Sequence, residues 1–245
     1  MHLLIDVGNT RIKWRLVDSE YDSSEVSHYG LLEDLSRFIK TITTHKIRVL
    51  LAAVNQTDDL KKLLADNNFK EVVIVHSKLA QAGLRNSYAN PERMGVDRWL
   101  AMIAAFAEVT REHKVQGIIV VDAGSALTID IVSALGEHLG GYIVPGLLMA
   151  QQALYANTER VIQYNEASAD SDQYDKYKKL GNNTIQCVEY GVINQMLALV
   201  KQVKDEYINH QVFFTGGDGE LLAESLKAGT VDRDLVLKGL WQVRN

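Results

Sequence analysis

The sequence HLLIDVGNTRIKWRLV at residues 2–17 decides the fold. It begins with an apolar run that ends in Asp6, turns at Gly8, and continues as a run in which apolar and polar residues alternate. An apolar run, a glycine turn and an alternating run are typical of a β-hairpin. We therefore predict a buried strand at residues 2–6 and a half-exposed strand at residues 11–17.

The same pattern returns half a chain later as GIIVVDAGSALTIDI at residues 117–131. Each copy has an aspartate, one further residue, a glycine and a polar residue, beginning at Asp6 and at Asp122. Such self-similarity indicates two copies of one structural unit. The copies differ because the apolar Ile129 stands where the first has Lys13, so only the first hairpin is expected to offer a lysine to an anion.

The rest of the chain alternates strand and helix patterns, which predicts an α/β fold in two lobes, residues 1–115 and 116–245. The helix after Gly95 is expected to carry Asp97 and Arg98 on a face other than its apolar stripe. The expected helices lie at 31–42, 57–67, 95–106, 147–158 and 183–207 with one terminal helix, the strands at 47–54, 72–75 and 211–215, and the turns and loops at 77–91, 140–146, 163–181 and 216–219.

Composition excludes several classes of function. The chain has 26 basic and 31 acidic residues, a net charge of −5, and no basic run longer than a pair, so nucleic acid is not an expected partner. With Cys187 as the single cysteine, no internal disulfide can form, and a reducing, cytoplasmic setting is expected. No apolar run approaches the length of a membrane span, and the cysteine and histidines have no zinc-ligand spacing.

The chemistry of the hairpin turns points to a polyanion and a metal ion. A glycine lets the backbone N–H groups approach phosphate oxygens, and successive N–H groups form an anion nest. Asp6 cannot attract a phosphate, so it is expected to bind Mg²⁺, with Lys13 neutralising a phosphate oxygen. A third glycine turn, TGGDG at residues 215–219, strengthens this interpretation over a simple strand end.

These repeated turns resemble the superfamily of actin, hexokinase and the heat-shock ATPases, in which ATP lies in a cleft between two duplicated ribonuclease H-like lobes. Within it, three motifs resemble those of type III pantothenate kinases. They are DVGNTRIK at residues 6–13, GVDR at residues 95–98 and GGYIVPG at residues 140–146, and they occur in the family's order. One departure is Ser125, where the commonest family form has threonine; serine keeps the hydroxyl.

The resemblance implies transfer of the γ-phosphoryl group of ATP to the primary hydroxyl of pantothenate, giving 4′-phosphopantothenate, the first step toward coenzyme A. Asp97 would be the general base, Asp122 would bind a monovalent cation, K⁺ or NH₄⁺, and a homodimer interface would complete the pantothenate pocket. The implied substrate-binding residues are Tyr88, Gly95, Val96, Asp97, Arg98 and Thr184, and the ATP-binding residues are Asp6, Val7, Gly8, Asn9, Thr10, Arg11, Ile12, Lys13, Ser125, Gly216 and Gly217, the last two lying under the adenosine.

Other interpretations stay open at this point. Asp97 and Arg98 could be helix-dipole compensation and a solvated arginine, and Thr184 could be only a helix cap. The protein could also be a non-catalytic accessory factor for gene regulation within the same family. A different kinase or an exopolyphosphatase of the superfamily is a further alternative, although those usually have inserted domains.

Overall fold

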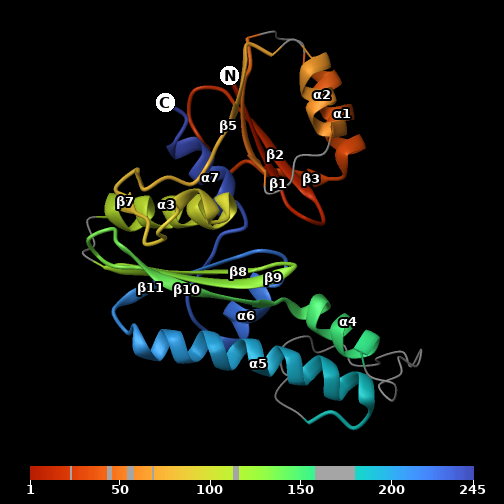
Figure 1. Cartoon of the computed structure of the whole chain (residues 1–245), viewed down its shortest axis with the longest axis vertical. Helices are drawn as coiled ribbons and strands as arrows, with labels where there is room; N and C mark the ends of the chain where they lie inside the picture. The colour runs from red at the N-terminus through yellow and green to blue at the C-terminus, as the bar shows by residue number, and fades with distance from the viewer. Residues whose placement is uncertain (23, 43–45, 54–57, 68, 113–115, 158–179) are drawn as a thin grey trace. The chain divides into compact units, whose positions relative to one another are not determined.

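The computed structural model describes the chain except residues 23, 43–45, 54–57, 68, 113–115 and 158–179 (Figure 1). It divides into two compact units. Unit 1 comprises Met1–Lys114, Leu135–His138 and Asp234–Asn245, and unit 2 comprises Val115–Ala134 and Leu139–Arg233. Residues 234–245, which we expected in the C-terminal lobe, therefore group with unit 1.

Unit 1 contains a five-stranded sheet in the order β3-β2-β1-β4-β5. The predicted hairpin is confirmed, since β1 pairs antiparallel with β2 and parallel with β4. The short β3 was not predicted, because three residues are too few to show alternation. The strands are β1 (His2–Val7), β2 (Ile12–Val17), β3 (His28–Gly30), β4 (Arg48–Ala53) and β5 (Glu71–Ile74).

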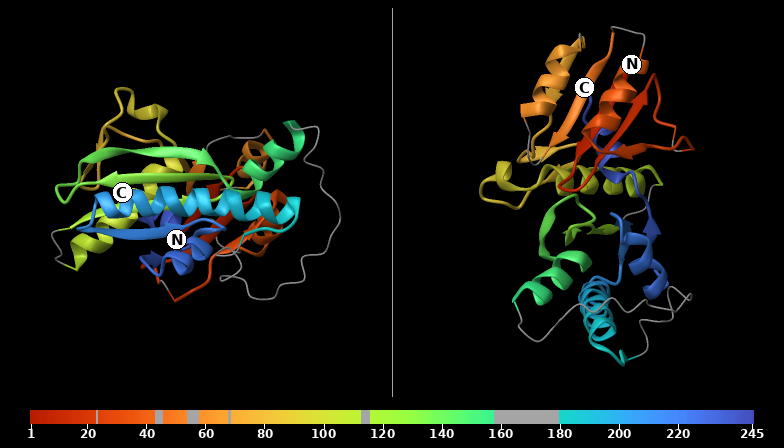
Figure 2. Two further views of the ribbon diagram at one scale, coloured as in Figure 1. Left: turned by 90° about the horizontal axis from the view of Figure 1, so that it is seen from below. Right: turned by 90° about the vertical axis from the view of Figure 1, so that its right-hand side faces the viewer.

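Helices cover both faces of this sheet. On one face lie α1 (Leu32–Thr41) and α2 (Asp58–Asp66) (Figure 2). Apolar residues of these helices pack on Leu3 and Ile5. Side chains alternate between the faces of a strand, so the fully buried Leu4 points to the other face. There α7 (Leu235–Gln242) packs on β1 and β4 and against α3 (Val96–Arg111).

The contact between α3 and α7 explains why the last helix belongs to unit 1. A Cβ added to Gly239 would lie 2.2 Å from the carbonyl oxygen of Leu100. The two backbones therefore approach more closely than any side chain would allow. All of α7's apolar residues are buried, from Leu235 to Trp241. We predicted one terminal helix, but the chain forms α6 (Gly219–Leu226), β12 (Thr230–Val231) and α7.

The segment at residues 77–91 is not the unstructured loop that we predicted. It contains a small hairpin of β6 (Ala80–Gln81) and β7 (Leu84–Arg85), followed by a 3₁₀ turn at Pro91–Arg93. Ala82 and Gly83 join the strands with φ angles of 50° and 83°. Two positive φ angles make the tight turn whose twist suits a hairpin, and alanine at the first position hid that signal.

Unit 2 repeats the topology of unit 1, with the strand order β10-β9-β8-β11-β12. Here β8 pairs antiparallel with β9 and parallel with β11, as β1 does with β2 and β4. The predicted duplication is therefore confirmed. The strands are β8 (Gly117–Ala123), β9 (Ala126–Val132), β10 (His138–Pro145), whose first residue is counted in unit 1, and β11 (His210–Thr215).

Two helices cover one face of this second sheet. Apolar residues of α5 (Thr184–Glu206) and α6 form its core with β8, β9 and β11, and Figure 2 shows α5 running across the sheet. A third helix, α4 (Leu147–Asn157), packs against α5. None of the helices in the described residues is both long and apolar enough to span a bilayer.

The predicted glycine-rich turn at residues 140–146 is wrong. Residues 140–145 belong to the edge strand β10, where Pro145 ends a strand that has one neighbour. A Cβ on Gly141 would lie 2.2 Å from the carbonyl oxygen of Ile129. The glycine at position 141 therefore allows β10 to approach β9 closely and does not form a turn. Most of the predicted loop at residues 163–181 lies outside the described residues.

Candidate active site

The turn at residues 8–11, which we expect to bind phosphate and call the first phosphate turn, joins β1 and β2 in unit 1. The N–H of Gly8 donates to the carbonyl oxygen of Arg11 at 3.1 Å, which closes the turn. A Cβ on Gly8 would lie 3.1 Å from the same oxygen, so a larger residue would be crowded there. Asp6 and Lys13 are direct partners in the strand register and so share one face of the hairpin. The hairpin thus presents a carboxylate and an ammonium group beside a tight turn.

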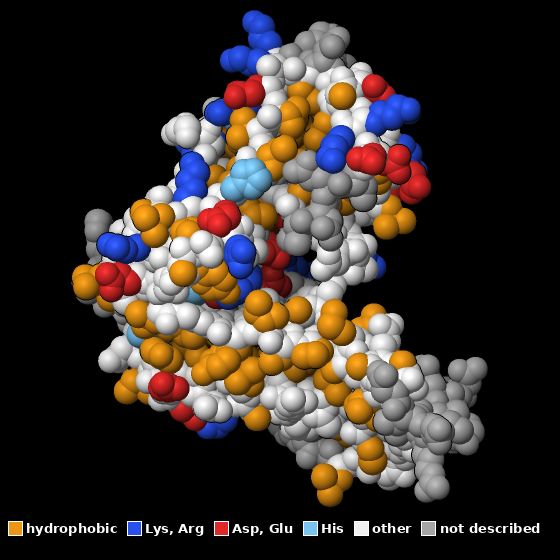
Figure 3. All heavy atoms as spheres, viewed as in Figure 1, with side chains coloured by type: hydrophobic (Ala, Val, Ile, Leu, Met, Phe, Trp, Pro, Cys, Tyr) orange, Lys and Arg blue, Asp and Glu red, His pale blue; other side chains and the backbone are white. Residues whose placement is uncertain are grey.

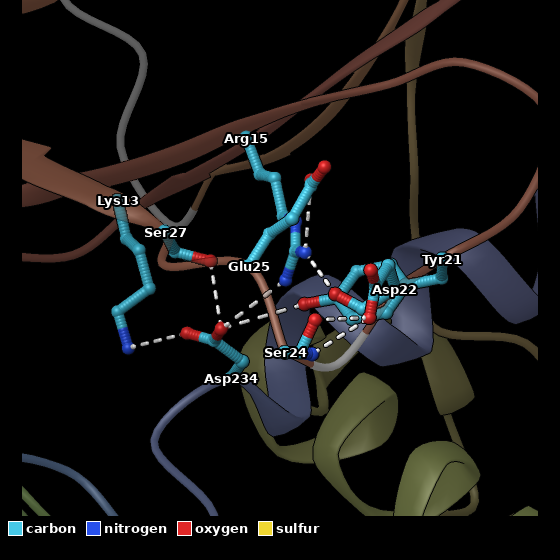
Figure 4. Close-up of polar contacts among 8 residues, drawn as sticks. All are labelled: Lys13, Arg15, Tyr21, Asp22, Ser24, Glu25, Ser27 and Asp234. Carbon is cyan, nitrogen blue, oxygen red and sulfur yellow. Dashed lines mark hydrogen bonds and ion pairs between the residues drawn. The ribbon is translucent and has the colours of Figure 1, made fainter.

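The polar side of β2 is covered, although we expected it to be half exposed. Arg15 is 2% exposed, and its guanidinium lies 4.3 Å from the ring centre of Tyr21 (Figure 4). Its NH2 group lies 3.2 Å from Glu25, and its NH1 group lies 3.8 Å from Asp234. Burial alone lowers the pKa of Arg15, but Tyr21, Glu25 and Asp234 raise it above its ordinary value. Arg15 is therefore a buried cation.

The second phosphate turn, Gly124 and Ser125, joins β8 and β9 in unit 2. The N–H of Gly124 donates to the carbonyl oxygen of Ala126 at 2.9 Å. The strand register pairs Asp122 with Thr128. The counterpart of Lys13 is therefore Thr128 and not Ile129, because this turn is shorter than the first one. The first hairpin still has the lysine, and the second has a hydroxyl in its place.

Two glycines of distant motifs pack on the end of β8 and on the turn that follows it. The N–H of Gly146 donates to the carbonyl oxygen of Ser125 at 3.1 Å, and a Cβ there would lie 2.2 Å from the carbonyl oxygen of Gly124. Gly216 has a φ of 83°, and its Cβ would lie 2.5 Å from Oδ1 of Asp122. Within unit 2 the structure therefore brings together Asp122, Ser125 and Gly216.

The remaining residues of the third turn differ from Gly216. A Cβ on Gly217 would meet no described atom within 4 Å, so the protein itself does not demand glycine there. The N–H of Asp218 donates to the carbonyl oxygen of Ala123 at 2.9 Å, and burial raises the pKa of its carboxyl group. Our sequence reasoning did not assign Asp218 a role, because a single aspartate after two glycines is an ordinary turn residue.

The start of α3 in unit 1 holds the predicted base. Oδ1 of Asp97 accepts a hydrogen bond from the N–H of Arg98 at 2.8 Å. A Cβ on Gly95 would lie 2.5 Å from this oxygen, so the glycine makes room for the carboxylate to fold back over the helix start. No described residue hydrogen-bonds to Oδ2 of Asp97.

Arg98 is not solvated, so the alternative that it is only a surface arginine is wrong. It is 6% exposed, and its NH1 group donates to the hydroxyl of Tyr88 at 3.0 Å. The N–H of Tyr88 donates in turn to the buried Asn86, whose Nδ2 contacts the sulfur of Met94. The structure therefore brings Asp97, Arg98 and Tyr88 together, with Val96 buried in the same helix turn. Sequence reasoning missed Asn86, which holds the Tyr88 backbone.

Thr184 lies at the start of α5 in unit 2. It is exposed and is the first residue of the helix, but the cap is Asn183, whose side chain accepts a hydrogen bond from Gln186 at 2.9 Å. The capping explanation of Thr184 is therefore wrong. Thr184 lines a hollow of about 550 Å³, together with Leu154, Asn182, Cys187 and Gln195 among others.

Metal binding by protein side chains alone has no support in the described part of the chain. No three residues among its histidines, cysteines, aspartates and glutamates lie close enough to hold an ion together. Each turn instead offers one aspartate, Asp6 or Asp122. Mg²⁺ keeps most of its waters and is usually held by one or two carboxylates and the phosphates of a substrate. This donor set therefore fits an ion that arrives with a nucleotide.

Comparisons with known proteins point to one family. Its sequence model, described as type III pantothenate kinase, matches residues 2–206. A relative named type III pantothenate kinase, from Pseudoalteromonas translucida (strain TAC 125), is 34% identical over 98% of this chain and 94% of its own length. Another of that name, from Azotobacter vinelandii, is 32% identical over 96% of this chain and 95% of its own length.

Solved structures agree on the fold. A protein from Campylobacter jejuni, described as a "conserved putative Baf family transcriptional activator", matches with a TM-score of 0.61 and 25% identity over 98% of this chain and 96% of its own. A "putative 2-dehydro-3-deoxygalactonokinase" from Sinorhizobium meliloti matches with a TM-score of 0.59, at 10% identity over 98% of this chain and 97% of its own. The latter similarity shows only that both chains share a two-lobed α/β fold.

Proposed function

The chain belongs to the type III pantothenate kinase family, and from that premise we propose how its residues phosphorylate pantothenate with ATP in coenzyme A biosynthesis. The observation that carries the proposal is the start of α3, where Asp97 lies beside the paired Arg98 and Tyr88. A carboxylate next to a buried guanidinium suits an acceptor that has a hydroxyl to deprotonate and a negative charge to hold.

We assign the nucleotide to the turns of both units. Residues 6–13 in unit 1 and Ser125 in unit 2 bind the phosphates through backbone N–H groups, and Lys13 neutralises a phosphate oxygen. Asp6 holds Mg²⁺, which supplies charge neutralisation of the β- and γ-phosphates when it is bound. Gly216 and Gly217 lie under the adenosine, and the open space at Gly217 supports that placement.

The transfer step follows from these roles. Asp97 accepts the proton of the primary hydroxyl as that oxygen forms its bond to the γ-phosphorus. The bond between the γ-phosphorus and the bridging oxygen breaks, and ADP leaves with the electron pair. The transition state of such transfers is loose, so positioning and charge neutralisation contribute more than the base does.

The acceptor is held by the remaining residues. Arg98 binds the carboxylate of pantothenate with two parallel donors, and Tyr88 keeps the guanidinium in place. Gly95 and Val96 shape the start of α3, and Thr184 contributes from the hollow in unit 2. Asp122 binds K⁺ or NH₄⁺, since carboxylate and carbonyl oxygens of a loose cage suit a large monovalent ion.

Association into a homodimer is part of the proposal. Five large apolar side chains of β10 and α4 in unit 2 are at least 46% exposed, and Figure 3 shows apolar side chains gathered on this unit. A monomer rarely leaves such a surface uncovered. Substitution Ile143→Asp is expected to convert a dimer to a monomer in sedimentation experiments. The five residues are Leu139, Tyr142, Ile143, Leu148 and Met149.

The deciding experiment measures ADP release with a panel of hydroxy acids, in buffers with potassium or with sodium alone. We expect turnover with pantothenate and potassium. ADP release that no hydroxy acid stimulates would favour the accessory, non-catalytic role, for which the similarity to a protein described as a transcriptional activator is the specific observation. The lone Cys187 is an exposed thiol, as suits the proposed cytoplasmic setting.

A further inference from the structure

Asp234 stands before the first residue of α7, yet its side chain does not cap the backbone N–H groups of that helix. It points instead toward the polar side of β2 (Figure 4). Its Oδ2 accepts a hydrogen bond from Ser27 at 2.7 Å and lies 3.5 Å from the hydroxyl of Tyr21. An N-cap aspartate usually accepts hydrogen bonds from the N–H groups of the first helical turn. The carboxylate of Asp234 instead contacts residues outside the helix, such as Ser27.

The two oxygens of Asp234 face different cations. Oδ2, already bonded to Ser27, lies 3.8 Å from NH1 of Arg15, and Oδ1 lies 3.6 Å from Nζ of Lys13. Lys13 and Arg15 are two residues apart on β2, so their side chains leave the same face of the strand. Without an anion between them, the two positive charges would repel each other. Asp234 therefore bridges the buried arginine and the lysine.

The bridge is anchored at the arginine. Arg15 is buried against the ring of Tyr21 and also contacts Glu25 and the carbonyl oxygen of Asp22. Ser27 is buried as well and fixes Oδ2 of Asp234. Lys13 and Asp234 are less enclosed, with side-chain exposures of 28% and 21%. The rigid part of the cluster thus lies at Arg15 and the accessible part at Lys13.

We propose that Asp234 is a positioning residue that holds the ammonium group of Lys13 ready for the phosphates of ATP. The inference rests on the proposed function, which makes Lys13 a phosphate ligand. A free lysine side chain loses rotamer freedom when it is fixed. An ion pair already made in the resting protein reduces that loss, and it occupies at most one of the three N–H donors.

The test is a double-mutant cycle on the full chain. Asp234→Asn keeps the shape, the acceptor for Ser27 and the preference for a helix N-cap, and removes only the charge. Two quantities are measured: kcat/KM for ATP, and the Kd of a non-hydrolysable ATP analogue, which requires no pantothenate. We expect Asp234→Asn to weaken both by about fivefold to twentyfold, within the usual range of coupling between contacting residues.

The control variant makes the same chemical change elsewhere in the cluster. Glu25→Gln also removes a carboxylate partner of Arg15, but from an exposed side chain, and it is expected to stay within about twofold of the wild type. In a Lys13→Ala background, Asp234→Asn should change the Kd by less than about twofold, because the group that it positions is gone. Melting temperatures of all variants identify any loss of folding.

Three outcomes would overturn the inference. The first is that the Asp234→Asn variant binds the analogue as tightly as the wild type or more tightly. The second is that its effect is equally large in the Lys13→Ala background, which would make the role of Asp234 structural. In both cases Lys13→Ala alone still weakens binding and the proposed function stands. Wild-type protein that does not bind the analogue would overturn the proposed function together with this inference.

Discussion

The guanidinium of Arg98 donates a hydrogen bond to the hydroxyl of Tyr88 at 3.0 Å, so two residues proposed to bind substrate form a single unit. One comes from the first turn of α3 and the other from the segment before the 3₁₀ turn. The buried position of Arg98 keeps water away from it, and a charge-assisted hydrogen bond is stronger in such surroundings. We therefore expect recognition of the acceptor to depend on both residues.

The first prediction concerns the carboxylate of the acceptor. Arg98→Lys should raise the KM for pantothenate more than that for ATP, because an ammonium group cannot present two parallel donors. For the same reason, pantetheine and N-substituted pantothenamides, which lack the carboxylate, should be phosphorylated with kcat/KM lower by about 10² or more. Steady-state kinetics with each acceptor provide the measurement. Equal kcat/KM for pantothenate and pantetheine would contradict the role of Arg98.

The second prediction concerns the base. Asp97→Asn should lower kcat by about 10² to 10⁴, because an amide cannot accept the hydroxyl proton. The amide oxygen can still accept the hydrogen bond from the N–H of Arg98, so the helix start should keep its shape. Nucleotide binding, followed by titration, should survive. Near-normal turnover of this variant would remove Asp97 from the mechanism.

A third prediction concerns the monovalent cation. Asp122→Asn should reduce the stimulation by potassium to a level near that of the sodium-only buffer, because the amide no longer compensates a cation. Rates are measured over a potassium titration at constant ionic strength. Thr128→Val, at the residue paired with Asp122 across the strands, tests whether the neighbouring hydroxyl also matters. Wild-type activity that is equal in sodium and in potassium would refute the cation site.

The fourth prediction concerns packing on the second phosphate turn. Gly146→Ala should destabilise the protein by about 1 to 3 kcal/mol and weaken ATP binding, because its Cβ would lie 2.2 Å from the carbonyl oxygen of Gly124. Gly191→Ala in α5 is the matched control, since a Cβ there meets nothing within 4 Å among the described atoms. Urea unfolding and ATP titration measure the two effects. Equal behaviour of both variants would argue against this packing role.

The fifth prediction is a loss of stability at high pH. Burial, and then the nearby Asp234, raises the pKa of Tyr21 to about 12. A tyrosine in the unfolded chain titrates near about 10, so between these values the folded protein keeps a proton that the unfolded chain has released. The free energy of unfolding should therefore fall as the pH rises from about 10 to 12. Tyr21→Phe should remove part of that fall, and the exposed Tyr29→Phe should not.

The sequence predicts the parts of the site that are local. A strand that ends in aspartate, a glycine turn and an alternating strand lie within a few residues of each other, so the pairing of Asp6 with Lys13 follows from the pattern. The duplication is visible for the same reason. The roles of Gly146 and Gly216 are partly visible, since glycine marks them, but only the fold shows that Gly146 packs on the turn at residues 124–125 and Gly216 on the end of β8.

Contacts between distant segments could not be predicted. Arg15 looks like an ordinary polar residue of an alternating strand, and nothing near it indicates that it is buried. Its partner Asp234 lies at the start of the last helix. Asp234 is 207 residues from Ser27, its hydrogen-bond partner, and a local sequence pattern cannot reveal a contact between residues so far apart. The prediction of a turn at residues 140–146 was wrong for another reason. Glycine permits both a turn and the close approach of two strands, and only the position of the Ile129 carbonyl oxygen beside Gly141 shows which of the two occurs.

The position of α7 has a consequence for how unit 1 folds during synthesis of the chain. Strand β1 and the first phosphate turn are synthesised long before α7, the helix that packs on β1. Until α7 has been synthesised, one face of the first sheet stays exposed to solvent, and the ion pair between Lys13 and Asp234 cannot form. Unit 1 can therefore complete its part of the proposed nucleotide site only after residues 234–245 have been synthesised. Premature termination anywhere before residue 234 would leave that site unassembled.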